Sequence, residues 1–217
     1  MERLRVLTYA LGLVASPLLI LVYWLLYPAY GDLHASDVFA DISAHPGRTH
    51  VADVVVLAGC LLAVAGALAY LQVLADRAPR LARLGATFTV VGWIAVACLL
   101  LLDVVAAQAT TTPRVFTAVY GDPFVIVLNA LAALHIVGGV LIGVALLRTR
   151  LVPRALAAAG TAAPVVHFVS NVSGLLWVDA STWLVVAAMG AVVLRGFTGA
   201  ARTEPSPRRD GLLVSPA

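Results

Sequence analysis

Residues 84–107 read LGATFTVVGWIAVACLLLLDVVAA, an apolar run in which Asp103 carries the only charge. An α-helix rises 1.5 Å per residue, so about 20 apolar residues cross the roughly 30 Å hydrocarbon core of a membrane. This segment is therefore predicted to be a transmembrane helix. A charge inside a bilayer costs at least a few kcal/mol, so Asp103 is expected to face the protein interior or a wet cavity.

The same length and apolar character recur in five other segments. The six predicted spans are residues 6–27, 51–75, 84–107, 124–147, 155–177 and 182–197. The composition agrees, because 62% of the 217 residues are hydrophobic and only 12% are charged, against about a quarter charged in soluble domains. We expect an all-α, polytopic membrane bundle of six transmembrane helices over residues 1–198. Residues 199–217 are rich in Arg, Pro and Ser and are predicted to be a disordered tail.

The basic residues are distributed unequally between the two sides. All 14 are arginines, and only Arg48 and Arg114 fall in the loops opposite the termini. Because short cytoplasmic loops carry the excess of basic residues, both termini are predicted to be cytoplasmic. The location that fits is the inner (plasma) membrane of a bacterium, with membrane lipids as the surroundings. The net charge of +3 comes from arginines at helix ends and does not indicate a nucleic-acid partner.

Small residues and prolines indicate how the helices pack. Gly139 and Gly143 form a GxxxG pair, a spacing that allows two transmembrane helices to approach closely. Pro164 removes a backbone hydrogen bond, so it is expected to bend its helix and free the carbonyl of Gly160. In the first long loop, Ser36 is predicted to cap a short amphipathic helix.

Ionisable and amide side chains interrupt the apolar spans mainly in the half away from the termini. His135 and His167 are each expected near the midplane, on the fourth and fifth spans. His167, Ser170 and Asn171 lie on one helical face, because residues three and four apart are neighbours on a helix. The pattern predicts a polar pocket that opens outward or sideways into the outer leaflet.

These residues supply candidates for proton-transfer chemistry. A carboxylic acid can donate a proton to a substrate and a neutral imidazole can accept one. The predicted catalytic residues are Asp103, His135, His167 and Asp53. The predicted substrate-binding residues are Asn129, Asn171, Ser170, Phe168, Trp177 and His50.

Structural interpretations compete with these assignments. Asp53 and His50 suit the interfacial start of a helix, and Asn129 suits a hydrogen bond between helices. Asp179 is expected to cap the last span. Trp93, Trp177 and Trp183 are interpreted mainly as interfacial anchors.

The two cysteines, Cys60 and Cys98, are each isolated in an apolar span. They are expected to be small buried thiols, although their similar depth on adjacent spans leaves a redox pair open. The sequence has no CxxC, HExxH or other metal-ligand spacing. It also has no phosphate-binding glycine loop. We therefore expect no metal and no cofactor.

Three short segments carry a resemblance: RAPRLAR at 77–83, LVPR at 151–154 and SAHPGR at 43–48. With them the chain resembles the small multi-pass membrane proteins of unknown function found in actinobacteria, which implies a fold and no activity. In size and helical build it is also similar to integral-membrane terpene cyclases. That similarity implies acid–base chemistry on an isoprenoid-like substrate, with a carbocation near Phe168 or Trp177.

The leading hypothesis is therefore an isomerase- or cyclase-like enzyme for a lipophilic small molecule. One alternative is a proton-linked transporter, which a polar path through the inner halves would favour. A second is a haem protein with His135 and His167 as axial ligands, which a Soret band would reveal. A third is a non-catalytic accessory subunit with a membrane-protein partner, in which the polar residues only join helices.

Overall fold

The computed structural model of the protein describes residues 2–32, 34–109 and 113–203, and within these residues the regular secondary structure is entirely helical. Six segments are long and apolar enough to cross a membrane: Leu4–Leu26, Pro46–Leu74, Pro79–Leu102, Pro123–Thr149, Arg154–Val172 and Leu176–Gly196. The predicted all-α, six-span polytopic bundle is therefore confirmed.

Two of the spans are built from more than one helical piece. In chain order the elements are α1 (Glu2–Ala10), the π-helical turn η1 (Leu11–Ala15), α2 (Ser16–Leu26), α3 (Ala35–Ala44), α4 (Pro46–Leu74), α5 (Pro79–Ala109), α6 (Pro113–Tyr120), α7 (Pro123–Ala132), α8 (Leu134–Thr149), α9 (Arg154–Val172) and α10 (Leu176–Thr203). Four of the helices begin with proline, which suits the first helical position because no backbone donor is needed there.

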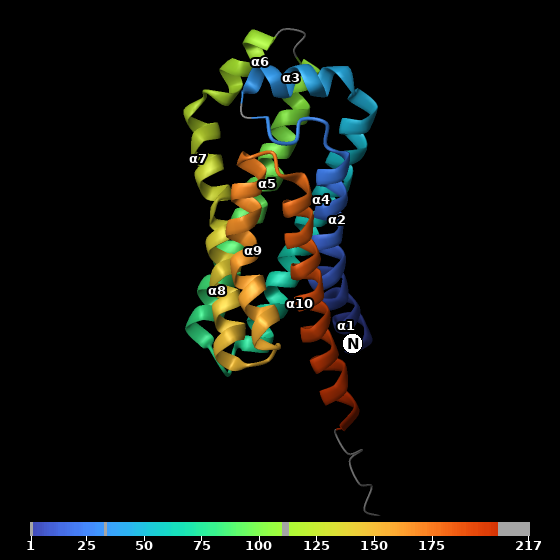
Figure 1. The fold of residues 1–217 in the computed structure, drawn as a ribbon, viewed down its shortest axis with the longest axis vertical. Coiled ribbons are helices and arrows are strands. Elements are labelled where there is room, and N and C mark those ends of the chain that lie inside the picture. Colours follow the sequence, from blue (N-terminus) through green and yellow to red (C-terminus); the bar gives the residue numbers. More distant parts are fainter. Residues whose placement is uncertain (1, 33, 110–112, 204–217) are drawn as a thin grey trace, which may run out of the picture.

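The six spans form a closed ring. Going round it, α2 packs on α4, α4 on α5, α5 on α8, α8 on α9 and α9 on α10, and α10 closes the ring against α2. Figure 1 shows α1 and the last turns of α10 at one end, which we call the terminus end, and α3 and α6 at the other, which we call the loop end. A ring of six helices encloses a central space, and the candidate site lies there.

Glycines allow the helices to approach at backbone distance. A Cβ added to Gly66 would collide with the backbone of Gly12, so α4 and η1 touch there. The predicted use of the GxxxG pair is confirmed, because Gly143 packs against Thr161 and Gly139 against Pro164. Close packing of small residues is the main source of helix association in a lipid environment.

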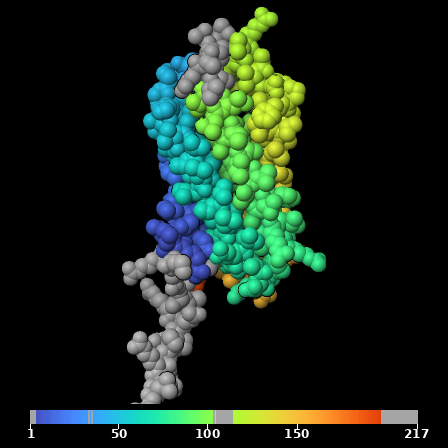
Figure 2. Space-filling view, turned by 180° about the vertical axis from the view of Figure 1, so that it is seen from behind, coloured from blue at the N-terminus to red at the C-terminus, as the bar shows by residue number. Residues whose placement is uncertain are grey.

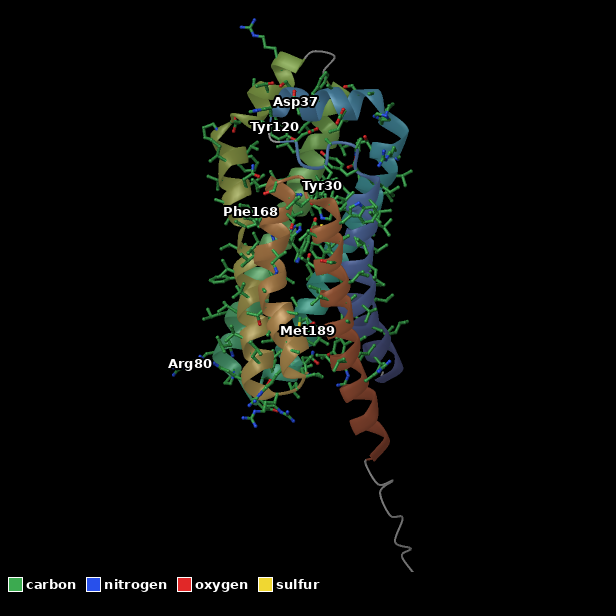
Figure 3. All side chains as sticks on the ribbon, viewed as in Figure 1. Tyr30, Asp37, Arg80, Tyr120, Phe168 and Met189 are labelled. Atoms are coloured by element: carbon green, nitrogen blue, oxygen red, sulfur yellow. The ribbon has the colours of Figure 1, made fainter. Side chains whose placement is uncertain are left out.

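The loop end is covered by α3 and α6, which pack on each other (Figure 1). Phe39 and Phe116 meet there with ring centroids 5.3 Å apart, and Phe116 is fully buried. The expected capping role of Ser36 is wrong: α3 starts at Ala35, so Ser36 lies within its first turn. Asp37 lies at this end and Arg80 at the terminus end (Figure 3).

The boundaries of the last two spans differ from the prediction. Helix α9 ends at Val172 and α10 starts at Leu176, whereas the predicted spans ended at 177 and began at 182. Gly174, with φ +67°, makes the tight turn between them, a conformation that glycine adopts without a steric cost. Residues 199–203 of the predicted tail continue α10, and residues 204–217 lie outside the described residues.

The outside of the bundle is apolar, as a lipid-facing surface should be. Viewed from behind, α4, α5 and α7 form one wall (Figure 2). Large apolar side chains of this wall are more than half exposed, among them Leu61, Ile94 and Ile126. Cys98 also belongs to this exterior, so its expected burial is wrong, while Cys60 is a buried free thiol as predicted.

Candidate functional site

Four aromatic rings meet inside the bundle, and we call them the ring quartet: Trp93, His135, His167 and Trp183. The ring centroids of Trp93 and His135 are 4.8 Å apart, and those of His167 and Trp183 are also 4.8 Å apart. The two imidazoles are separated by 6.0 Å, and so are the two indoles. The expected interfacial role of Trp93 and Trp183 is wrong, because both are buried in this quartet.

His167 is held by a buried carboxylate. Its Nδ1 lies 2.6 Å from Oδ1 of Asp179, which is fully buried. A carboxylate accepts a hydrogen bond, so Nδ1 of His167 carries the proton and Nε2 carries the lone pair of the neutral imidazole. This arrangement fixes the tautomer and would stabilise the imidazolium if Nε2 took up a proton.

Two further side chains orient the carboxylate. The hydroxyl of Tyr30 donates to Oδ2 of Asp179 at 3.2 Å. The hydroxyl of Thr182 lies 2.7 Å from the backbone carbonyl of Asp179 and 3.3 Å from Oδ1. Tyr30 precedes the loop helix α3, and burial, followed by the charge of Asp179 and the hydrogen bond to it, raises its pKa. Tyr30 therefore stays protonated and remains a hydrogen-bond donor.

A break in the fourth span positions His135. The amide of Ile136 bonds to the carbonyl of Ala133, which leaves the carbonyl of Ala132 without its regular helical partner. Nδ1 of His135 lies 2.5 Å from that carbonyl oxygen. A carbonyl only accepts, so Nδ1 carries the proton here too. On the other side, Gly92 lets α5 touch the backbone at His135, because a Cβ at Gly92 would overlap it.

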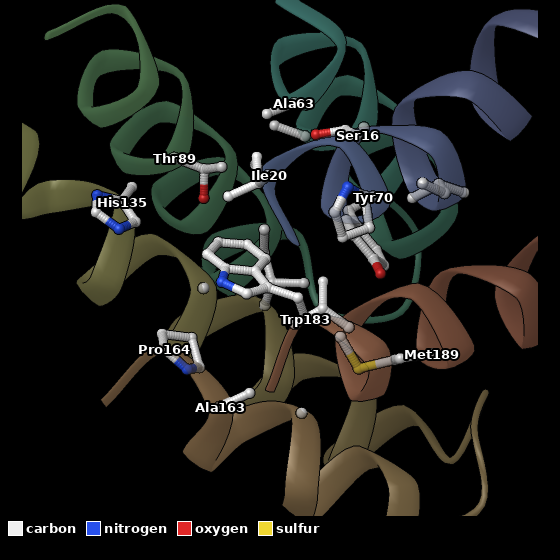
Figure 4. A pocket seen from close by; sticks show the side chains of 18 of the residues that line it. Ser16, Ile20, Ala63, Tyr70, Thr89, His135, Ala163, Pro164, Trp183 and Met189 are labelled. Carbon is white, nitrogen blue, oxygen red and sulfur yellow. The ribbon is translucent and has the colours of Figure 1, made fainter. Parts of the chain in front are cut away.

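Two cavities meet at the quartet. The one towards the terminus end has a volume of about 110 Å³ and reaches Tyr70 and Met189. The one towards the loop end has a volume of about 270 Å³ and reaches Tyr23 and Asn171. Both are lined by Ile20 and the four rings of the quartet. Figure 4 shows side chains from α2, α4, α5, α8, α9 and α10 converging on the first cavity.

Together the two cavities form an elongated, largely apolar space. On α4 the lining runs from Val56 to Tyr70, a length of about 21 Å at the helical rise per residue. Figure 3 shows Met189, which lines the cavity towards the terminus end, well below Tyr30, which lies towards the loop end. The shape suits a long, thin, lipophilic molecule.

The structure brings together only some of the predicted site residues. His135, His167, Asn129, Asn171 and Phe168 line the cavity towards the loop end. Within this set, the amide of Asn129 also donates to the carbonyl of Val125 at 3.0 Å, a bond within its own helix. Five of the ten predicted residues therefore share one cavity.

Other predicted residues lie elsewhere. Asp53, His50, Ser170 and Trp177 line neither cavity, and Trp177 is 77% exposed because it belongs to the start of α10. Asp103 is on α5, but its side chain lies outside the described residues. His167 is five residues from the end of α9, about 7 to 8 Å along the helix, and its expected position near the midplane stays a prediction.

Asp179 is the residue that the sequence analysis missed, because it was interpreted as a helix cap. The signal was the Ser173–Gly174 pair, which marks the turn between α9 and α10. His167 and Asp179 are equally distant from Ser173 along the chain. Residues equally distant from the turn of an antiparallel helical pair lie at one depth, so the two side chains can meet.

The haem alternative stays a prediction. The centroids of the two imidazoles are 6.0 Å apart, and Nδ1 of each ring is bound within the protein, which leaves Nε2 of both rings as possible ligands. Among the described residues, no group of three or more His, Cys, Asp or Glu side chains is placed to hold a metal ion.

Comparisons with protein-family models, with curated proteins and with solved structures found no match to the chain.

Proposed function

We propose that this protein binds a lipophilic, isoprenoid-like small molecule inside the bundle and catalyses an acid–base isomerisation or cyclisation of it. The observation that carries the proposal is the buried pair of His167 and Asp179 in the wall of an elongated apolar cavity. A titratable pair beside a large apolar cavity is a typical arrangement of a catalytic site.

The proposed reaction begins with His167 as the imidazolium. Nε2 gives its proton to one carbon of a substrate double bond, and the other carbon becomes a cation. The neutral imidazole, or another base, then takes a proton from a neighbouring carbon, and the electrons of that C–H bond form the new double bond. One proton is given and one is taken, so the product is an isomer of the substrate.

The surroundings of His167 support these steps. Trp24 and Trp183 lie beside its imidazole, with ring centroids at 5.8 and 4.8 Å. The faces of indole rings attract cations, so they would stabilise a carbocation formed next to His167. Asp179 stabilises the imidazolium through Nδ1, and Tyr30 holds Asp179 in place. Asp179 and Tyr30 are thus positioning residues in this proposal.

A transporter receives less support. The terminus end of the bundle is filled by an apolar cluster that includes Leu13, Leu74, Leu146 and Val193. A path for protons or polar solutes would need to cross this cluster. The accessory-subunit alternative stays a prediction, and it differs from the proposal in requiring no turnover.

The arginine distribution supports the location. We infer that the protein is in the plasma membrane of a bacterium, of the actinobacterial kind that its turns resemble, with both termini cytoplasmic. On that orientation the loop end faces outward, and the larger of the two cavities lies towards the outer side.

Deuterium uptake tests the proposed function. The protein in lipid nanodiscs is incubated in heavy water with isoprenoid alcohols and hydrocarbons, and the extracted lipids are analysed by mass spectrometry. We expect the wild type to incorporate deuterium at carbon and His167→Gln to lose this activity. His50→Gln is the matched control, because His50 is exposed and lines neither cavity. Absence of uptake by a folded wild-type protein that binds a probe would contradict the proposal.

A further inference from the structure

Several buried polar atoms around the cavity towards the terminus end have no hydrogen-bond partner in the described part of the chain. They are Nε2 of His135, Nε1 of Trp183, the hydroxyl of Thr89 and the hydroxyl of Tyr70. Buried polar groups in folded proteins are nearly always hydrogen-bonded, and each exception calls for an explanation. Four such atoms around one cavity point to a common partner inside it.

Two of these atoms define what that partner must be. Nδ1 of His135 donates to Ala132, so Nε2 in the neutral ring is an acceptor. Nε1 of Trp183 is a donor and cannot accept. A group that satisfies both must donate to His135 and accept from Trp183. A hydroxyl does this, whereas an ether or a ketone can only accept, and a hydrocarbon does neither.

The two side chains lie in the same part of the molecule. His135 and Trp183 both line the two cavities, and each packs against Trp93 and His167 with ring centroids 4.8 or 6.0 Å apart. In Figure 4 the labelled side chains of Thr89 and His135 lie on one side of Trp183, and Tyr70 lies on the other. Two of the four unpartnered atoms therefore belong to the quartet, where the two cavities meet.

We propose that the ligand is a long-chain alcohol whose hydroxyl binds between Nε2 of His135 and Nε1 of Trp183, with its chain in the apolar cavities. This inference rests on the proposed function, because it specifies the substrate class of the same site. It gives His135 and Trp183 a role in recognition, while His167 keeps the proton-transfer role.

Paired probes test the hydroxyl. Geranylgeraniol and its methyl ether are titrated separately into the protein in nanodiscs, and binding is followed by quenching of tryptophan fluorescence. The alcohol is expected to bind at least about tenfold more tightly, which corresponds to the loss of one net hydrogen bond. His135→Phe removes the acceptor, so the alcohol and the ether should bind this variant with about equal affinity.

Two other variants keep the test falsifiable if His135→Phe does not fold. Trp183→Phe removes the donor and should weaken the alcohol and the ether to a similar extent, because the oxygen of either probe can accept from Nε1. His50→Gln is the control, because His50 is exposed and lines neither cavity, so this variant should leave the preference unchanged.

Each outcome is decisive. Equal affinity for the alcohol and the ether in the wild type would overturn the hydroxyl inference and would indicate that water satisfies His135 and Trp183, while the proposed function would stand. Failure of both probes to bind would instead count against the proposed function. A preference that persists in His135→Phe, or affinities for both probes that are unchanged in Trp183→Phe, would place the hydroxyl elsewhere and overturn the inference.

Discussion

The helices of the bundle pack differently in the terminus half and around the ring quartet. In the terminus half, glycines and alanines bring helix backbones together, and the core is an apolar cluster from Tyr9 to Val193. Around the quartet, large aromatic rings and the hydrogen-bonded pair of His167 and Asp179 surround the junction of two cavities, the smaller of which extends into the terminus half as far as Tyr70. The larger cavity lies towards the loop end, where close packing is given up for a site.

The largest effect is expected from breaking the buried pair. In Asp179→Ala, His167 and Tyr30 both lose their partner inside the protein. Removing one member of a buried pair typically costs about 3–5 kcal/mol. Unfolding in detergent should show a loss of this size, together with loss of deuterium uptake. Asp76→Ala, at an exposed position near the terminus end, is the control and should change neither stability nor deuterium uptake. If Asp179→Ala also kept wild-type stability and uptake, a role for the pair would be refuted.

The next effect belongs to the terminus half. A valine at position 66 would push into the backbone of Gly12, so Gly66→Val should separate η1 from α4. Overpacking of this kind costs about 1–3 kcal/mol, measurable by thermal unfolding in detergent. Gly196→Ala is the control, since a Cβ at Gly196 meets nothing within 4 Å. If both variants unfold at the same temperature, close backbone contact is not what stabilises this half.

A smaller effect is expected at the hydrogen bond that orients the carboxylate. Tyr30→Phe removes the donor to Oδ2 of Asp179 and leaves the ring in place. One hydrogen bond contributes about 1 kcal/mol net, so unfolding should be only slightly easier, while turnover should fall because Asp179 loses its orientation. Equal turnover in Tyr30→Phe and the wild type would exclude a positioning role for this hydroxyl.

The smallest effect concerns a cluster of three carboxyl groups, Asp32 in the loop before α3 and Asp37 and Asp41 within α3. Burial, followed by the charge of Asp41 and a hydrogen bond with it, raises the pKa of Asp32, and the charge of Asp37 adds to this. A carboxyl whose pKa is higher in the folded state favours folding at low pH, and this contribution is lost as the pH rises through the raised pKa. The effect is expected to be within about 0.5 kcal/mol near the surface.

Asp41→Asn tests this by removing the main charge next to Asp32. In the variant the pKa of Asp32 should be lower, so the protein should lose less stability between acidic and neutral pH than the wild type does. Melting temperatures recorded across that range, for wild type and variant, give the comparison. Identical pH profiles would show that the carboxyl cluster is not coupled to folding.

Sequence predicted the fold well because span length and hydropathy are local properties. The GxxxG pair at Gly139 and Gly143 was also predicted to pack helices, because small residues at this spacing let two transmembrane helices approach closely. The site was harder, because it depends on which helices are neighbours. Asp179 looked like a cap until the turn at Gly174 placed it opposite His167.

The two tryptophans show the same limit. From their sequence alone, Trp93 and Trp183 were interpreted as interfacial anchors. Only the packing of the six helices into a closed bundle places them next to His135 and His167. Trp177 also lies among apolar residues, but it is exposed. The spacing of apolar residues along the chain therefore does not distinguish the buried tryptophans from the exposed one.

Photo-crosslinking tests the central claim, that the cavities at the ring quartet bind a lipophilic molecule. An isoprenoid alcohol carrying a diazirine near its hydroxyl is irradiated with the protein in nanodiscs, and labelled peptides are identified by mass spectrometry. The account predicts labels on cavity-lining residues such as Ile20, Trp93 and Trp183, reduced by an excess of unlabelled alcohol. Labels confined to lipid-facing residues such as Leu61 and Phe124, unaffected by competition, would contradict it.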